Sequence, residues 1–211
     1  MSAVNEWVVR EYFELLGYFV NQPCKFIVPG RPKTAEEEVD LVICHPRITE
    51  HVLPDGIVWT TKDLQTVSRA IVGICGAHSE RFYASSPGQV PDVLSFVHED
   101  SIRYASRLLG TDQMARILCL PKLPASGDLR KQTIDVLKSM GVTGIISFET
   151  ILMELIRRVD AKRNYEKSDL LQVLRLLKNY DFLKSSQMDL FEKKRRKRRK
   201  SVAPPRVEGV A

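Results

Sequence analysis

Short apolar segments alternate with helix-like segments in the second half of the chain, and this alternation constrains the fold more than any other feature. Apolar runs at 115–120 and 142–147 alternate along the chain with amphipathic segments at 93–109, 129–140 and 148–158. Strands that alternate with helices of about a dozen residues need crossover connections, which place neighbouring strands parallel in one sheet. The sequence therefore predicts an α/β fold with a largely parallel region of sheet.

The first half of the chain reads as one helix followed by strands. Apolar residues at helical spacing predict a helix over 4–16, which ends at a glycine. Strands are expected at 18–28, where a turn interrupts the pattern, at 39–44 and, for a shorter segment, at 57–59. The apolar run at 69–76 should lie centrally in the sheet, and its two glycines indicate close packing or close backbone approach.

A run of acids leads directly into the strand expected at 39–44. Glu38 and Asp40 are two residues apart, and in an extended chain such residues point to the same face. Two carboxylates on one face can share a divalent cation or a positively charged partner. The alternative is that the acids form a solvated loop and only the apolar half of the segment is strand.

The positive charge of the chain is concentrated near its end. The net charge is +6, and the eight consecutive cations at 193–200 exceed it, so the other residues carry a net charge of −2. Such a block cannot fold on itself, which predicts one domain over 1–183 and a disordered basic tail over 184–211. A targeting signal or a solubility tail has the same composition. We favour DNA or RNA as the partner, bound through phosphate contacts from Lys193, Lys194, Arg195, Arg196, Lys197, Arg198, Arg199 and Lys200.

Membrane insertion and secretion are not expected. No apolar run approaches the ~20 residues that span a bilayer, and the N-terminus lacks the pattern of a signal peptide. We therefore expect a cytoplasmic protein, associated with the nucleoid, or a nuclear one in a eukaryote.

The four cysteines contain no CxxC pair and are expected to pack as small hydrophobes. The alternative is a zinc site built from Cys44, His45, Cys75 and His78.

The order of elements resembles the core of the PD-(D/E)xK, or restriction endonuclease-like, nuclease superfamily over 4–120. The shared order is a helix with a glutamate, a strand, a strand with an acid, an apolar third strand, a helix and a strand. The resemblance implies a mixed sheet flanked by helices, with Glu6 and Asp40 as catalytic residues and Asp40 as a metal ligand. Glu38, two residues before Asp40, is the candidate for a second metal ligand from its spacing and not from the resemblance. In that family a divalent cation such as Mg²⁺ activates water for phosphodiester cleavage.

The third strand departs from the family pattern. Gly73 stands at the position of the second acid, and Cys75 stands at the position of the lysine. Without a second carboxylate the metal is held weakly, and without the lysine nothing orients the attacking water. His78 and Glu80 follow the strand and are the candidates to replace these groups, with His78 as a catalytic base or as a structural hydrogen-bonding residue.

Three functions stay open. The favoured one is nucleic-acid binding by a nuclease-like protein with an inactive or altered site and no cofactor, in which Arg81 beside Phe82 adds a phosphate contact. A simpler role for Arg81 is an ion pair with Glu80. The second function is a Mg²⁺-dependent DNA endonuclease with a migrated site. The third is a protein-interaction module that docks a partner, or a second copy of the chain, through the acidic patch or the apolar helix expected at 169–179 with Ser168 as its N-cap.

Overall fold

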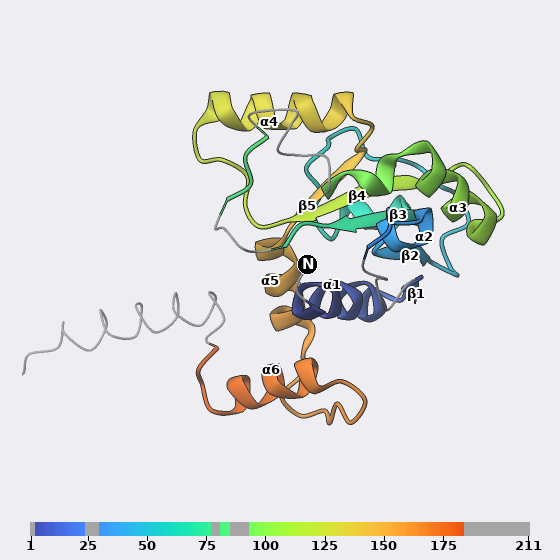
Figure 1. The fold of residues 1–211 in the computed structure, drawn as a ribbon. Helices are drawn as coiled ribbons and strands as arrows, with labels where there is room; N and C mark the ends of the chain where they lie inside the picture. Colours follow the sequence, from blue (N-terminus) through green and yellow to red (C-terminus); the bar gives the residue numbers. More distant parts are fainter. Residues whose placement is uncertain (1–2, 24–29, 77–80, 85–92, 184–211) are drawn as a thin grey trace, which may run out of the picture. The chain divides into compact units, whose positions relative to one another are not determined.

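The computed structural model describes residues 3–23, 30–76, 81–84 and 93–183 (Figure 1). Its contacts divide the chain into two compact units, Met1–Leu155 and Ile156–Ala211. The division lies earlier in the chain than the boundary expected at residue 183.

The first unit contains the sheet and most of the helices. Its elements are, in chain order, α1 Ala3–Leu16, β1 Phe19–Asn21, α2 Ala35–Glu38, β2 Leu41–Cys44, the 3-10 helix η1 Asp63–Thr66, β3 Arg69–Ile74, the 3-10 helix η4 Ser95–Val97, α3 Glu99–Leu109, β4 Ala115–Leu120, α4 Gly127–Ser139, β5 Gly144–Ser147 and α5 Phe148–Arg158, which continues past the division.

The sheet is mixed and has five strands in the order β1-β2-β3-β4-β5. β2 runs antiparallel to both β1 and β3, whereas β3, β4 and β5 are parallel. The parallel region is confirmed, because the crossovers through α3 and α4 return the chain to the same end of the sheet. β3 lies in the middle, as the run of apolar residues after Arg69 predicts. Residues 57–59 pair with β5 through one parallel bridge between Val58 and Ile145.

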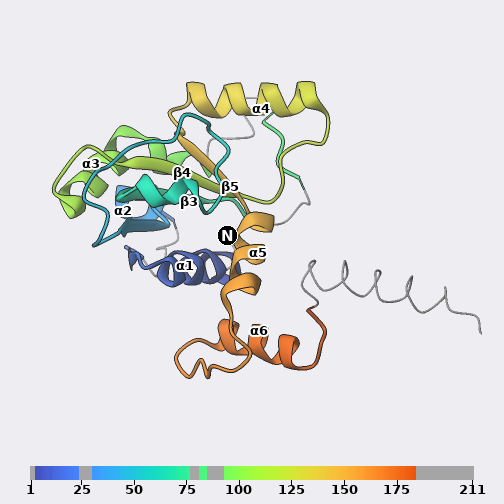
Figure 2. The ribbon, with the colours of Figure 1, turned by 180° about the vertical axis from the view of Figure 1, so that it is seen from behind.

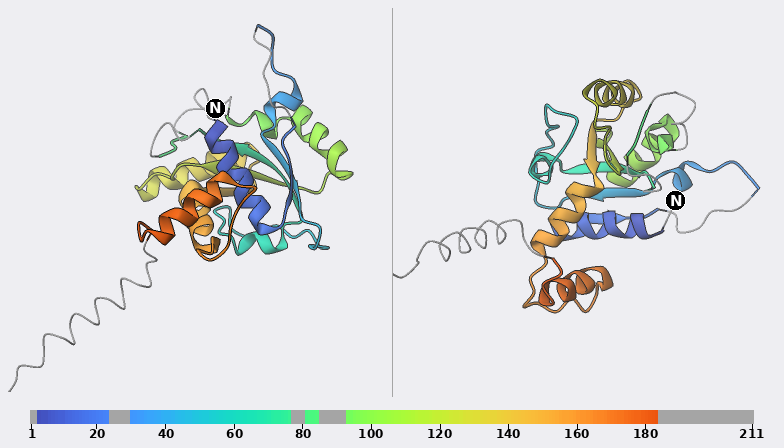
Figure 3. Two further views of the ribbon diagram at one scale, coloured as in Figure 1. Left: turned by 90° about the horizontal axis from the view of Figure 1, so that it is seen from below. Right: turned by 90° about the vertical axis from the view of Figure 1, so that its left-hand side faces the viewer.

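Helices cover both faces of this sheet. α1 lies against one face, and η4, α3 and α4 lie on the other (Figures 1 and 2). Figure 3 shows the same layering in the view turned about the vertical axis. The face below η4 and α3 buries Ile71 and Leu118, which pack with Phe96 in one apolar cluster. Side chains alternate along a strand, so Ile74 and its register partner Cys119 belong to the α1 face.

Two glycines in the strands allow aromatic rings to approach the sheet. A Cβ atom at Gly73 would lie 2.2 Å from the ring of Phe96, and one at Gly144 would lie 2.6 Å from the ring of Trp59. Both distances are far below van der Waals contact. Close packing, one of the two explanations expected for glycine in the third strand, is therefore what the structure shows at Gly73.

Two expected elements differ from the structure. The helix expected over 93–109 begins only at Glu99, because His98 has extended backbone angles (φ −65°, ψ 153°) and separates α3 from η4. The acids before β2 form the short helix α2 instead of entering the strand. Thr34 begins α2 with a capping box, in which Glu37 accepts a hydrogen bond from the Thr34 backbone N–H.

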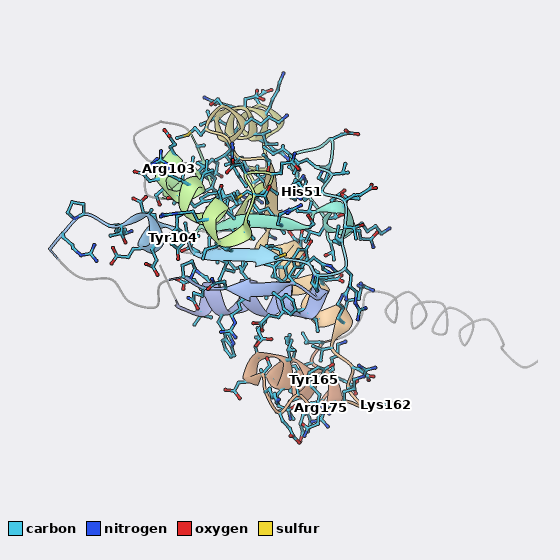
Figure 4. The ribbon with its side chains drawn as sticks, turned by 90° about the vertical axis from the view of Figure 1, so that its right-hand side faces the viewer. His51, Arg103, Tyr104, Lys162, Tyr165 and Arg175 are labelled. Atoms are coloured by element: carbon cyan, nitrogen blue, oxygen red, sulfur yellow. The ribbon has the colours of Figure 1, made fainter. Side chains whose placement is uncertain are left out.

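The second unit, in its described part, contains the last residues of α5, a loop and α6 Asp169–Asn179. Ser168 is the N-cap, as expected, and its hydroxyl accepts a hydrogen bond from the Leu171 N–H at 3.3 Å. Two side chains on α6 hold the loop, because Arg175 donates to the Ala161 carbonyl and Lys178 donates to the Val159 carbonyl. Figure 4 labels Arg175 together with Lys162 and Tyr165 of this loop.

Candidate site around Asp40

Asp40 lies between α2 and β2 and is hydrogen-bonded to the central strand. Its Oδ2 accepts a hydrogen bond of 2.6 Å from the backbone N–H of Ile74, the last residue of β3. The carboxylate thereby satisfies a backbone donor at the end of the strand. The sequence predicted an acid at the entrance of β2, and the structure identifies the Ile74 N–H as its hydrogen-bond partner.

Burial perturbs the acidity of Asp40. Loss of solvent raises the pKa of Asp40 from 3.8 to about 7. The hydrogen bond from Ile74 opposes this shift, and the charge of Glu6 adds to it. At neutral pH the side chain is therefore divided between the acid and the carboxylate. A buried carboxyl group that titrates near pH 7 is a recognised mark of a candidate functional site.

Glu6, on α1, is the second acid of this site. It raises the pKa of Asp40, so the two carboxyl groups are close enough to repel each other. Gln22 follows β1 and holds Glu6 through a hydrogen bond of 2.7 Å from its amide Nε2 to Oε2. Two residues expected to belong to one site, Glu6 and Asp40, are thus brought together from elements 34 positions apart in sequence.

Glu38 does not share an extended strand with Asp40, so the expectation from spacing was wrong. It is the last residue of helix α2. Its carboxylate accepts a hydrogen bond of 3.3 Å from the hydroxyl of Ser101 on α3, whereas Asp40 contacts β3. The physical reason is that the capped acidic helix ends the period-2 alternation on which the expectation relied.

The third strand provides no acid beside Asp40. Gly73 and Cys75 lie on the face covered by η4 and α3, away from α1 and Glu6. The residue that contacts Asp40 is Ile74, through its backbone. Its neighbour Cys119 is fully buried, and burial followed by the charge of Asp40 raises the pKa of that thiol. The third and fourth strands therefore add no second acid beside Asp40.

The described residues do not fit a divalent cation at this site. Glu6 and Asp40 are two ligands, Asp40 is partly protonated at neutral pH, and no group of three His, Cys, Asp or Glu side chains is assembled within the described ranges. Hard cations such as Mg²⁺ need several oxygen ligands in near-octahedral positions. His78 and Glu80, the proposed replacements, lie outside the described residues.

The alternative zinc site is contradicted by the sheet register. Cys44 pairs with Arg69 at the beginning of β3, whereas Cys75 follows the other end of that strand. Six residues of strand separate the two positions by about 20 Å. His45 instead packs edge-on against Tyr18, with 4.9 Å between ring centroids.

The guanidinium group of Arg81 is hydrogen-bonded within the first unit. Its Nη1 donates a hydrogen bond of 3.0 Å to the carbonyl of Leu123 in the loop after β4. Phe82, next to it, packs against the buried apolar cluster, as expected for a core side chain. The eight cations at 193–200 lie outside the described residues.

A second polar cluster, not expected from the sequence, lies in the loop between β2 and β3. Nδ1 of His51 (Figure 4) is 3.2 Å from both the backbone nitrogen and the hydroxyl of Ser68. Burial and the nearby charge of Arg69 lower the pKa of His51, which keeps the ring neutral at pH 7. We interpret this histidine as a structural anchor for the loop. A lone histidine in an irregular segment carries no sequence pattern that would have identified it.

Among the described residues, no helix has the length and apolar character needed to cross a membrane.

Comparison of the chain with protein-family models, with curated proteins and with solved structures found no match in any of the three.

Proposed function

We propose that the protein binds nucleic acid through residues 156–211 and that its first unit is a restriction endonuclease-like body without a working nuclease site. The observation that carries the proposal is the distribution of charge. Residues 1–155 contain 15 Lys and Arg against 19 Asp and Glu, a net charge of −4, whereas residues 156–211 contain 17 against 7, a net charge of +10. A positive segment on a weakly acidic body suits a polyanion better than it suits general solubility.

The restriction endonuclease-like assignment is part of the proposal. Support comes from the order α1, β1, β2, β3, α3, β4, which follows the order that the resemblance implies. Further support comes from Glu6, whose charge acts on Asp40 and raises its pKa. The third strand argues for a site that has lost catalysis, because Gly73 stands where an active member has an acid and only the backbone N–H of Ile74 reaches Asp40.

The experiment is a salt titration of DNA affinity. For duplex DNA the logarithm of the binding constant falls by about 0.9 per phosphate contact for each tenfold increase in salt. Eight contacts from 193–200 give a slope of about −7 as an upper limit. Replacing all eight cations by Gln at unchanged length should remove most of the affinity and of the slope. Salt-insensitive binding by the wild-type chain, or unchanged binding by the Gln variant, would refute the proposal.

Divalent-metal-dependent cleavage is the second candidate, and the pairing of Glu6 with Asp40 is the observation that favours it. It requires ligands from outside the described residues. Cleavage of supercoiled DNA should be tested in Mg²⁺ and in Mn²⁺ with wild-type protein and with Asp40→Asn, which keeps an acceptor for the Ile74 N–H. Cleavage by the wild-type chain that is lost in the variant would establish this function in place of an inactive site.

A further inference from the structure

We propose that Tyr180 and Phe182, at the end of α6, stack on unpaired bases, so that the second unit prefers single-stranded nucleic acid to duplex. The inference rests on the proposed function, since it assigns the kind of nucleic acid that the basic segment binds. The two rings are described residues of the second unit, and the cations at 193–200 enter only as a feature of the sequence.

The two rings are open to solvent. Tyr180 is 72% exposed and Phe182 is 75% exposed, more than the other large hydrophobic side chains of the described residues. Aromatic side chains stabilise a fold by being buried, so these two contribute little to the packing of their own unit. Two neighbouring aromatic side chains left in water are typical of a binding surface.

The backbone at this helix end is fixed. The N–H of Tyr180 donates to the Leu176 carbonyl at 3.0 Å, and the N–H of Phe182 donates to the Leu177 carbonyl at 2.9 Å. Between them Asp181 adopts the left-handed conformation (φ 58°), which closes the helix as a C-terminal cap. The exposed rings are therefore attached to an ordered turn, which lowers the entropy lost when they bind.

The basic run lies close to the two rings in the sequence. The first cation of the basic run, Lys193, follows Phe182 by eleven residues, a reach of at most about 40 Å. A single strand can thus contact both the rings and the cations. Aromatic platforms beside a basic groove are the general means of binding single strands, because every base presents a π-face while the phosphates meet positive charge. In a duplex the base faces are already stacked and are not available.

A protein partner is the competing occupant of this helix. Val173 and Leu176 are also exposed, at 51% and 43%, and belong to the same helix as Tyr180. The charge of the unit favours the nucleic acid, since an apolar protein surface gains nothing from a segment with a net charge of +10. The experiment below separates the two occupants.

The test measures fluorescence anisotropy of a labelled 20-nucleotide mixed-sequence DNA strand, and of its duplex, as full-length protein is added. The test variant is Tyr180→Ala with Phe182→Ala. The matched control is Phe19→Ala, which removes a ring that is 70% exposed on the first unit. A third variant, Val173→Ala with Leu176→Ala, removes the apolar side chains of α6.

The expected result is a loss of affinity confined to one variant and one ligand. The double aromatic variant should bind the single strand about 5- to 150-fold more weakly for each stacked base, while its salt dependence stays unchanged because the phosphate contacts remain. Its duplex affinity, and both affinities of the Phe19→Ala control, should stay at the wild-type values. Restoring rings with Tyr180→Phe and Phe182→Tyr should restore binding to the single strand.

Two results would overturn the inference. Unchanged affinity of the double aromatic variant would show that the rings do not stack on bases. An equal loss of single-strand affinity in the Val173→Ala, Leu176→Ala variant would show that the loss reflects the integrity of α6 and not stacking by the rings. Failure of the wild-type chain to bind either ligand refutes the proposed function itself, so the two failures are distinguishable.

Discussion

Asp40→Asn should make the protein more stable at pH 8 and should have little effect near pH 4. The pKa of Asp40 is raised from 3.8 to about 7, chiefly by burial, so the folded state favours the protonated form. The stability contributed by this preference is complete below about pH 4, falls as the pH rises toward 7 and stays lost above it. At about 1.4 kcal/mol per pKa unit, the ionised group costs about 4 kcal/mol at pH 8.

Asparagine removes that cost and keeps the hydrogen bond. Its side-chain carbonyl can accept from the Ile74 N–H, and it removes the repulsion from Glu6. We expect a gain of roughly 1 to 4 kcal/mol at pH 8, since the buried amide has its own desolvation cost. Asp40→Ala should instead destabilise the protein at both pH values, because it leaves the Ile74 donor without its acceptor.

The assay is urea unfolding of the wild-type chain and both variants at pH 4.5, 6, 7 and 8, followed by circular dichroism. The difference between wild type and Asp40→Asn is the informative quantity, since groups other than Asp40 cancel in it. A difference that does not change with pH would show that Asp40 is ionised normally, and a destabilised Asn variant at pH 8 would show that the carboxylate itself is required.

Gly73→Ala should cost about 1–3 kcal/mol, because its Cβ would lie 2.2 Å from Phe96, and Gly56→Ala, with open space around it, is the control in urea unfolding. Thiol labelling followed by mass spectrometry should modify exposed Cys44 quickly and buried Cys119 only on unfolding, so rapid labelling of Cys119 would contradict the packing. Millimolar Mg²⁺ should shift the unfolding midpoint of the wild-type chain no more than that of Asp40→Asn, and a larger upward shift in the wild type would reveal a cation site.

The sequence identified most elements because their patterns are local. The apolar runs at 115–120 and 142–147 alternate with helix-like segments, and this was enough to predict parallel strands. Ser168 marked the beginning of α6, because it is the N-cap of that helix. Positions 36–38 were read incorrectly, since a capping box at Thr34 makes a helix from acids that also fit the entry of a strand.

The composition of the site depended on distant parts of the chain. The sequence by itself determined that an acid precedes a buried strand, that the expected third-strand acid is absent and that eight cations stand together at 193–200. Only the tertiary structure decided that Asp40 accepts a hydrogen bond from the backbone of Ile74 and feels the charge of Glu6, while Glu38 turns to α3. Spacing along the chain sets local conformation, but the desolvation and charge that control a carboxyl group come from residues that folding brings next to it.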